Sequence, residues 1–363
     1  MTLEQLIGAA LMLLFLADVF LTVLYARAGT GLLAPYWNRA IWALLHGASR
    51  LFGRRSATVL SLAGPLIVVS LIGFWAVGLT VGAALLIHPE LGTAIRPSSG
   101  GTPTDFITAL LVAGNSLSIV GGGDYAPHTA ATRMLYLANS LVGTSVLSLV
   151  LSYLVQVYSA LRERNTLALS VDLMTGGTGD AAEMLARLMP AGDGGTATSE
   201  LGNLARSLAA TKEAHHFYPV LFYFRFKDPR YSVSRICFVL LDLATLVDTA
   251  LDPRRYGALA KSGPVTSLRL GASLLIETLD GNFPTTGNLS DGTGETWRER
   301  QSYVAATQTL AHAGIAHQSD GIEGYVAARG EWERLIRRVA PTLGYTMQEI
   351  DRRSGAKERF QSP

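Results

Sequence analysis

The residues of this chain whose types and order could bind an ion lie between Thr104 and Arg164. A glycine triplet, residues 121–123, is followed at once by Asp124 and then by Pro127. Glycine can adopt backbone torsions that turn carbonyl oxygens toward a common point, and rings of carbonyl oxygens can replace the water shell of a cation. Glycine triplets also form ordinary turns. The triplet alone therefore does not distinguish an ion site from a turn, and the segments on either side of it supply the evidence.

A short apolar segment precedes the triplet and a long one follows it. Residues Thr104–Leu111 are too few to cross a bilayer, whereas Arg133–Tyr158 form a full span that is closed by Arg162 and Arg164. A helix that enters the membrane without crossing it must return through non-helical backbone, which is tolerated only inside protein or beside a water-filled cavity. The C-terminal end of such a helix carries a partial negative charge that favours a cation. This order of parts predicts a pore.

The same order of parts resembles the pore module of the potassium channel superfamily in its two-span form. The signature of that family is Thr-Val-Gly-Tyr-Gly-Asp, and the nearby Pro127 also agrees with the family. The resemblance implies that Gly143, in the span that follows, is a gating hinge. It also implies that the ion-conducting filter consists of Ile119, Val120, Gly121, Gly122, Gly123 and Asp124, of which Val120, Gly121, Gly123 and Asp124 match the signature.

Two filter positions depart from the family. Ile119 stands where the family has a threonine whose hydroxyl binds the innermost ion, and Gly122 stands where it has an aromatic residue that braces the filter. We therefore expect monovalent cations to permeate, with potassium favoured and sodium as the alternative. The same departures support a second hypothesis, a membrane sensor or regulatory subunit that keeps the pore architecture without conducting.

The composition indicates a membrane protein rather than a soluble enzyme. Hydrophobic residues make up 49% of the 363 residues and charged residues only 16%, against about 25% charged residues in ordinary soluble domains. The net charge of +2 does not predict a nucleic-acid partner. The sequence contains no zinc-ligand spacing, nucleotide-binding loop or nucleophile–base set. We therefore expect no enzymatic activity, no cofactor and no metal centre.

Three segments are long and apolar enough to cross a bilayer. They are Leu3–Tyr25, Val59–Ile87, in which Pro65 predicts a kink, and Arg133–Tyr158. Residues 27–55 and 162–164 are basic, and short basic loops stay in the cytoplasm. This pattern predicts a multi-pass protein of the inner cell membrane, with the N-terminus and pore loop outside and the C-terminal half in the cytoplasm. Because one chain supplies one pore loop, we expect a homotetramer.

Two features near the N-terminus leave alternatives open. Asp18 lies inside the first span, where a carboxylate is either functional or an inter-helix hydrogen-bond partner, and we favour the hydrogen bond. Apolar residues between 32 and 45 recur at helical spacing. This segment is predicted to be an amphipathic helix, either at the membrane interface or packed on the cytoplasmic domain.

The predicted fold class is an all-α membrane protein, with three transmembrane helices, a re-entrant pore loop and a mainly α cytoplasmic C-terminal domain. The predicted domains are residues 1–56 with the first span and interfacial helix, 57–164 with the pore module, and 165–363 with the regulatory domain. In the last, Ile236–Leu251 reads as a buried core helix and Phe217–Phe226 as a strand or a helix. We expect this domain to gate the pore by pulling on the inner helix near Gln156–Asn165.

The second half of the chain offers few other groups for chemistry. The pair His215–His216 could bind a metal or sense pH, but no cysteine or carboxylate cluster accompanies it, so we favour a structural role. Cys237 lies in an apolar run and is expected to be buried and unreactive. A loop with Asp280, Asn282, Asp291 and Glu295 does not fit a calcium-binding loop and is expected to be solvated.

Overall fold

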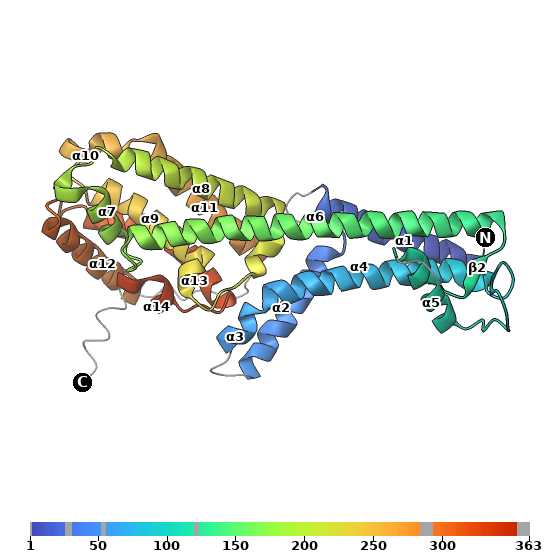
Figure 1. The fold of residues 1–363 in the computed structure, drawn as a ribbon. Coiled ribbons are helices and arrows are strands. Elements are labelled where there is room, and N and C mark those ends of the chain that lie inside the picture. Colours follow the sequence, from blue (N-terminus) through green and yellow to red (C-terminus); the bar gives the residue numbers. More distant parts are fainter. Residues whose placement is uncertain (1, 26–30, 52–55, 120–122, 284–292, 354–363) are drawn as a thin grey trace. The chain divides into compact units, whose positions relative to one another are not determined.

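The structure is a computed structural model that describes residues 2–25, 31–51, 56–119, 123–283 and 293–353 (Figure 1). The chain forms two compact units, which are described separately. The first consists of Met1–Leu44 and Pro65–Tyr158, and the second of Leu45–Gly64 and Ser159–Pro363. The regular secondary structure of the described residues is helical apart from one small hairpin and two isolated bridges, which confirms the predicted fold class.

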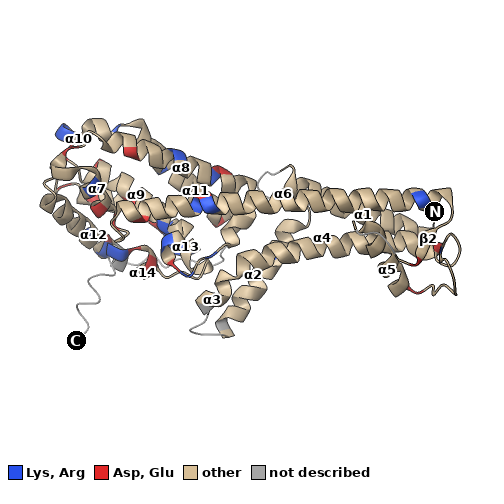
Figure 2. Cartoon of the chain, in the orientation of Figure 1, with Lys and Arg blue, Asp and Glu red and all other residues tan. Residues whose placement is uncertain are grey.

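The described residues contain three helices long and apolar enough to span a membrane, as predicted. They are α1 (Leu3–Val23), α4 (Ala63–Ile87, continued by a turn to Glu90) and α6 (Ala130–Met174). A shorter apolar helix, α5 (Phe106–Leu117), lies between α4 and α6 in the sequence. Charged side chains are concentrated in the second unit, whereas α4 carries none (Figure 2).

The start of the second span differs from the prediction. Instead of one helix from Val59 with a kink at Pro65, the structure has a short helix α3 (Ser56–Ser61), a break at Leu62 and then α4. Proline has no N–H to donate, and its ring clashes with the carbonyl four residues earlier, which here is that of Ser61. The helix therefore ends at Ser61 and restarts with Pro65 in its first turn, where a missing N–H costs nothing.

The third span is part of a much longer helix than predicted. The apolar run ends at Tyr158, but α6 continues without interruption to Met174, a length of 45 residues. The sequence between Gly143 and Gly176 contains neither glycine nor proline, so nothing in it stops the helix. Gly176 and Gly177 both adopt positive φ angles, of 65° and 78°, and end it there.

Asp18 joins three helices of the first unit. Its carboxylate is fully buried, and Oδ1 accepts hydrogen bonds from the backbone N–H groups of Leu33 (2.6 Å) and Ala34 (3.2 Å) at the start of α2 (Ala34–Leu51). Its Oδ2 accepts from Trp75 Nε1 on α4 at 2.7 Å. The first N–H groups of a helix have no partner within the helix, so a carboxylate is well placed to satisfy them. The predicted inter-helix hydrogen bond is confirmed.

The helix predicted from the apolar spacing of residues 32–45 is α2. Its first part packs on α4 in the first unit, where Trp37 stacks on Phe74 at 4.2 Å and donates from Nε1 to Ser70 Oγ. Tyr36 and Leu44 remain exposed, as the interfacial alternative requires, whereas the residues from Leu45 onward belong to the second unit.

The second unit is a helical domain arranged around α9 (Val233–Thr249). Residues Val233–Val247 of α9 are all buried, which confirms the predicted core helix. The segment Phe217–Phe226, predicted as a strand or a helix, contains a short 3-10 helix, Pro219–Tyr223, and no strand. The other helices are α7 (Ala181–Leu188), α8 (Ala197–Phe217), α10 (Pro253–Ala260), α11 (Gly263–Asn282), α12 (Thr293–His312), α13 (Ile322–Thr342) and α14 (Met347–Ile350).

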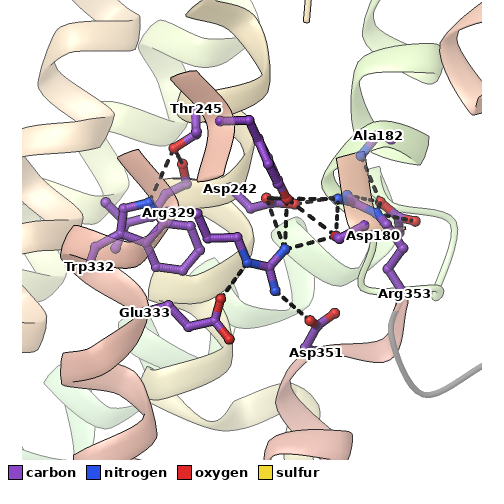
Figure 3. A network of polar contacts seen from close by, with 12 residues as sticks. Asp180, Ala182, Asp242, Thr245, Arg329, Trp332, Glu333, Asp351 and Arg353 are labelled. Atoms are coloured by element: carbon purple, nitrogen blue, oxygen red, sulfur yellow. Dashed lines mark hydrogen bonds and ion pairs between the residues drawn. The ribbon is translucent and has the colours of Figure 1, made fainter. Parts of the chain in front are cut away.

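A network of buried charges closes the core of this unit (Figure 3). Arg329 on α13 donates to Glu333 and to Asp351, the latter at 2.5 Å. Arg353 pairs with Asp242 of α9 at 2.8 Å and with Asp180, the N-cap of α7. Buried charges are tolerated when they are paired and hydrogen-bonded, so this network ties α7, α9, α13 and the chain after α14 together.

The network predicts an acid-dependent loss of stability. Burial raises the pKa of Asp180, but the charge of Arg353, its hydrogen bonds and the Ala182 N–H lower it by more, so the pKa lies below its ordinary value. A carboxyl with a lowered pKa stabilises the folded protein above its unfolded pKa of about 4, and this contribution is lost as the pH falls further. We expect Asp180→Asn to cost about 2 kcal/mol at pH 7 and to reduce the loss of stability between about pH 5 and pH 3.

Chemical denaturation of the full protein in detergent across this pH range is the measurement. Asp193→Asn, at an exposed aspartate of the same unit, is the control and should leave the acid limb unchanged. An acid limb as steep in Asp180→Asn as in the wild type would contradict the assignment.

The Asp18 contacts predict a second stability effect. In Asp18→Leu the indole N–H of Trp75 and the N–H groups of Leu33 and Ala34 lose their acceptor, so we expect a loss of about 3 kcal/mol. Asp18→Asn keeps one oxygen acceptor and should lose less. Thermal unfolding in detergent measures both variants, and equal stability of Asp18→Leu and the wild type would show that the carboxylate does not hold the helices.

Candidate functional site

The short helix α5 is positioned by a cap at its start. Asp105 accepts from the Thr108 N–H at 3.0 Å and from the Thr108 hydroxyl at 2.8 Å, so the helix begins at Phe106. It runs for 12 residues to Leu117, six residues beyond the predicted Leu111. At about 1.5 Å per residue this is about 18 Å, well short of the hydrocarbon thickness of about 30 Å. The helix has the half-span length that the pore prediction requires.

The structure describes half of the six predicted filter residues. Val120, Gly121 and Gly122 lie outside the described residues. Ile119 follows α5 with 61% of its surface exposed, and Asp124 is also exposed. Gly123 has a φ of +121°, in the region that favours glycine.

One residue of this site was not predicted from the sequence. A Cβ atom added to Gly123 would lie 2.7 Å from Nδ2 of Asn115, so the Asn115 side chain backs directly onto the last glycine of the run. The signal was present as an amide side chain on a mostly apolar short helix, four positions before Ile119. Asn115 therefore occupies the space beside the Gly123 backbone.

A small hairpin holds the chain where it leaves the glycine run. Strands β1 (Ile95–Pro97) and β2 (Tyr125–Pro127) pair antiparallel, with Arg96 opposite Ala126. The His128 N–H also donates to the Ala94 carbonyl at 2.9 Å. The residue after Asp124 is thus fixed to the loop that follows α4.

His88 joins the end of α4 to two other segments. Its Nδ1 lies 2.7 Å from Glu4 Oε1 on α1, and its Nε2 lies 3.1 Å from the Thr104 carbonyl oxygen just before α5. The ring also meets Phe106 edge-on at 5.8 Å. The two polar partners of the ring are a carboxylate oxygen and a backbone carbonyl oxygen. His88 therefore helps to fix the entry into α5.

The end of α5 rests directly on α6. Asn139 of α6 is buried and donates from Nδ2 to Ser116 Oγ at 2.9 Å. A Cβ atom added to Gly143 would lie 1.8 Å from the Leu117 carbonyl oxygen, closer than two non-bonded heavy atoms can approach. Gly143, the predicted hinge, lies in an uninterrupted part of α6 and is the point where the C-terminal end of α5 touches it.

The polar residues of α6 that a pore would need are accessible. Thr144, Ser145 and Ser148 are exposed in the single chain, as is Gln156 one and a half turns before the arginines. Exposure of small polar side chains on an apolar helix is compatible with a water-filled cavity and with packing against another helix.

The other candidate groups predicted from the sequence, His215 and Cys237, are buried in the core of the second unit. His215 is fully buried beside Phe222, and its Nδ1 lies 2.8 Å from the Thr211 carbonyl oxygen. Burial, together with the charge of Arg164, lowers the pKa of His215 to about 3, so the ring is neutral at physiological pH. Burial raises the pKa of the Cys237 thiol, as expected for an unreactive cysteine.

Two described residues of the predicted solvated loop have side-chain partners. Asp280 pairs with Arg338, and Asn282 donates to the Thr278 carbonyl. Asp291 lies outside the described residues, and the structure does not describe the Glu295 side chain. No group of three or more histidine, cysteine or acidic side chains in the described ranges could hold a metal ion.

Comparison with known proteins finds a family that matches part of this chain. Residues 71–160 match the family described as "Ion channel". The matched segment starts in α4, includes α5 and the glycine run, and ends two residues after Tyr158 of α6. The predicted resemblance to the potassium channel pore module is confirmed for this ion channel module, which together with the apolar helices makes the chain a multi-pass membrane protein.

A curated protein is similar to this chain over a longer segment than the family match. The "Uncharacterized membrane protein YdjJ" of Bacillus subtilis (strain 168) is 23% identical over 164 residues, which cover 45% of this chain and 47% of the relative. The chain therefore matches about half of the length of that protein. No solved structure matches the chain at a significant level.

The contact between α5 and α6 predicts opposite effects for two glycines of the ion channel module. Gly143→Ala forces the end of α5 away from α6 and should lower the thermal stability of the protein. Gly114→Ala on α5 is the matched control, because its Cβ would meet only Thr80, at 3.9 Å, and alanine favours a helix by up to about 1 kcal/mol. Thermal unfolding in detergent measures both, and a Gly143→Ala protein as stable as Gly114→Ala would contradict the close contact.

Proposed function

We propose that this protein is a tetrameric channel for monovalent cations, with potassium favoured and sodium as the alternative. The carrying observation is the match of residues 71–160 to ion channels over the segment in which a half-span helix, a glycine run and a full span follow one another. The proposed filter is the Ile119–Asp124 run. Residues 57–164 are the proposed pore module and 165–363 the proposed regulatory domain in the cytoplasm.

Cation binding is supported by the direction of α5. The last residue of α5, Leu117, lies two positions before Ile119, the first residue of the proposed filter. The partially negative C-terminal end of the helix is therefore next to the filter segment. The described end of that segment, Gly123, has a backbone that only glycine adopts readily, and Asp124 adds a carboxylate. Backbone oxygens and a carboxylate suit cations rather than anions.

A tetramer is supported by the supply of one pore loop per chain, because a carbonyl filter needs a ring of loops. The orientation is supported by the basic residues on either side of the spans, with arginines at 27, 39, 50, 54 and 55 before α4 and at 162 and 164 in α6. In this orientation the pore loop and the N-terminus face outward across the inner cell membrane. Gly143 is the proposed gating hinge, and its lack of a side chain also permits the contact with Leu117.

A non-conducting sensor or regulatory subunit is the second candidate. The observation in its favour is Ile119, whose exposed aliphatic side chain offers no oxygen where the resembling family has a hydroxyl. Gly122, which replaces the family's aromatic brace, is the other departure. Flux measurements separate the two candidates, because the sensor passes neither potassium nor sodium.

The first experiment measures potassium and sodium flux separately in liposomes that contain the purified protein. We expect cation flux in the wild type and its loss in Gly123→Ala, because a side chain there is strained by the backbone and collides with Asn115. Gly101→Ala is the matched control in the loop before α5, where a Cβ would have open space. Absence of flux from the wild type in every condition, including after removal of residues 170–363, would favour the sensor.

Ion selectivity is tested at Ile119 with two side chains of the same shape. Ile119→Thr supplies a hydroxyl that can bind an ion, whereas Ile119→Val has the same branching without oxygen. We expect the ratio of potassium to sodium flux to rise several-fold in the threonine variant and to stay at the wild-type value in the valine variant. Equal ratios in both variants would show that this position does not set selectivity.

A further inference from the structure

A buried segment of the second unit holds parts of the chain that are far apart in the sequence. Residues 219–226, here called the strap, follow α8 and contain the short 3-10 helix Pro219–Tyr223. Val220–Arg225 are all buried. Its end is closed by Tyr345, which accepts from the Phe226 N–H at 3.2 Å and donates to the Phe226 carbonyl at 2.8 Å.

Arg164 of α6 is bound to the strap through backbone carbonyl groups. Its Nη1 donates to the Leu221 oxygen and its Nη2 to the Phe224 oxygen, both at 2.9 Å. The guanidinium also lies 5.5 Å from the ring centre of Phe226. The side chain is 1% exposed, so the whole group is inside the domain. This contact joins the helix that continues the third span to the strap.

Arg225 of the strap reaches in another direction. Its Nη1 donates to the Ala57 oxygen at 2.8 Å, in α3 just before the second span. Its Nε and Nη2 donate to the oxygens of Leu343 (3.0 Å) and Gly344 (2.8 Å), where α13 ends. The C-terminal end of a helix carries a partial negative charge, which favours a guanidinium there.

The start of α4 touches the strap directly. A Cβ atom added to Gly64 would lie 2.6 Å from Cγ and 2.9 Å from Cα of Phe224, so only glycine allows this approach. Leu60 of α3 packs close to Gly344, beside the carbonyl that Arg225 binds. The strap thus contacts the beginning of the second span as well as the continuation of the third.

The two arginines differ from the other buried arginines of this unit. Arg329 and Arg353 are neutralised by carboxylates, whereas within the described ranges neither Arg164 nor Arg225 forms an ion pair with an acid. Their hydrogen bonds all go to carbonyl oxygens, whose positions are set by the backbone conformation of the strap and its neighbours. A change in the strap backbone would therefore alter the hold on both helices at once.

We propose that the strap, residues 219–226, is the element through which the C-terminal domain acts on the pore, because it contacts the start of α4 at Gly64, holds α3 just before α4 through Ala57, and holds α6 through Arg164. This inference rests on the proposed channel function and deepens it. It assigns control to both pore-module spans, whereas the sequence suggested a pull on the inner helix alone.

The test compares two variants that loosen the strap at opposite ends, in the full-length protein in potassium-loaded liposomes. Gly64→Ala pushes Phe224 away from α4, and Arg164→Gln removes the guanidinium that holds α6. Both should change potassium flux in the same direction and by at least about fivefold, a usual size for coupling between sites. The ratio of potassium to sodium flux should stay unchanged, because the filter is untouched.

Matched controls exist on the same two helices. Gly73→Ala adds a Cβ into open space on α4, and Arg162→Gln removes an exposed arginine of α6 two residues before Arg164. Both controls should conduct as the wild type does. Wild-type flux in Gly64→Ala and Arg164→Gln, or changes in opposite directions, would overturn the proposal.

Hydrogen exchange on the same proteins keeps the proposal testable if the wild type passes no ions. In Gly64→Ala, backbone exchange should rise at 219–226 and also at 160–168, which the strap holds through Arg164, while the controls leave both segments protected. A rise confined to the residues around Gly64 would show that the strap does not link the two helices. Absent wild-type flux would count against the channel function and would leave this second outcome to decide on the strap.

Discussion

A helix that enters a bilayer without crossing it leaves backbone polar groups that lipid cannot satisfy, and the first unit depends on meeting this demand. Helix α5 ends against Gly143 of α6, and its Ser116 hydroxyl is bound by Asn139. The chain beyond it passes Asn115 and is then held by strand pairing with the loop after α4. The glycine and the two amides thus lie where the C-terminal end of the half-length helix and the chain after it meet the rest of the unit.

Buried polar groups do different work in the two units. In the first, Asp18 collects N–H groups from the start of one helix and the indole of another, so a single carboxylate fixes three helices. In the second, Arg329 forms ion pairs with acidic side chains from α9, α13 and the chain after α14, and these side-chain contacts hold the core together. Arg164 is held by carbonyl oxygens instead, and that contact exists only for one shape of the strap.

Much of the architecture follows from local properties of the sequence. Apolar length alone predicts the three spans and the half-span, and the acids within a 16-residue apolar run separate the core helix α9 from a membrane span. The effect of Pro65 was harder to predict, because the sequence does not show whether a proline bends a helix or ends one. The length of α6 was missed because the apolar run ends at Tyr158, although no residue that stops a helix appears before Gly176.

The remaining contacts could not be predicted because their partners are distant in the sequence. Arg353 and Asp180 are 173 positions apart, and Arg225 and Ala57 are 168 apart. Nothing in the local pattern distinguishes Arg164, which is buried, from Arg162, which is exposed two residues earlier in the same basic cluster. Pairings of this kind depend on how the helices pack, and only the folded structure reveals them.

The single cysteine of the chain has a practical consequence. Cys237 is fully buried in α9, and its thiolate, the form that reacts with alkylating probes, is disfavoured by that burial. The natural protein therefore serves as its own cysteine-free background for labelling. A cysteine introduced at one exposed position, for example in the loop between α4 and α5, would be the reactive site for a fluorophore or spin label, so the surroundings of that position could be followed without first replacing a core residue.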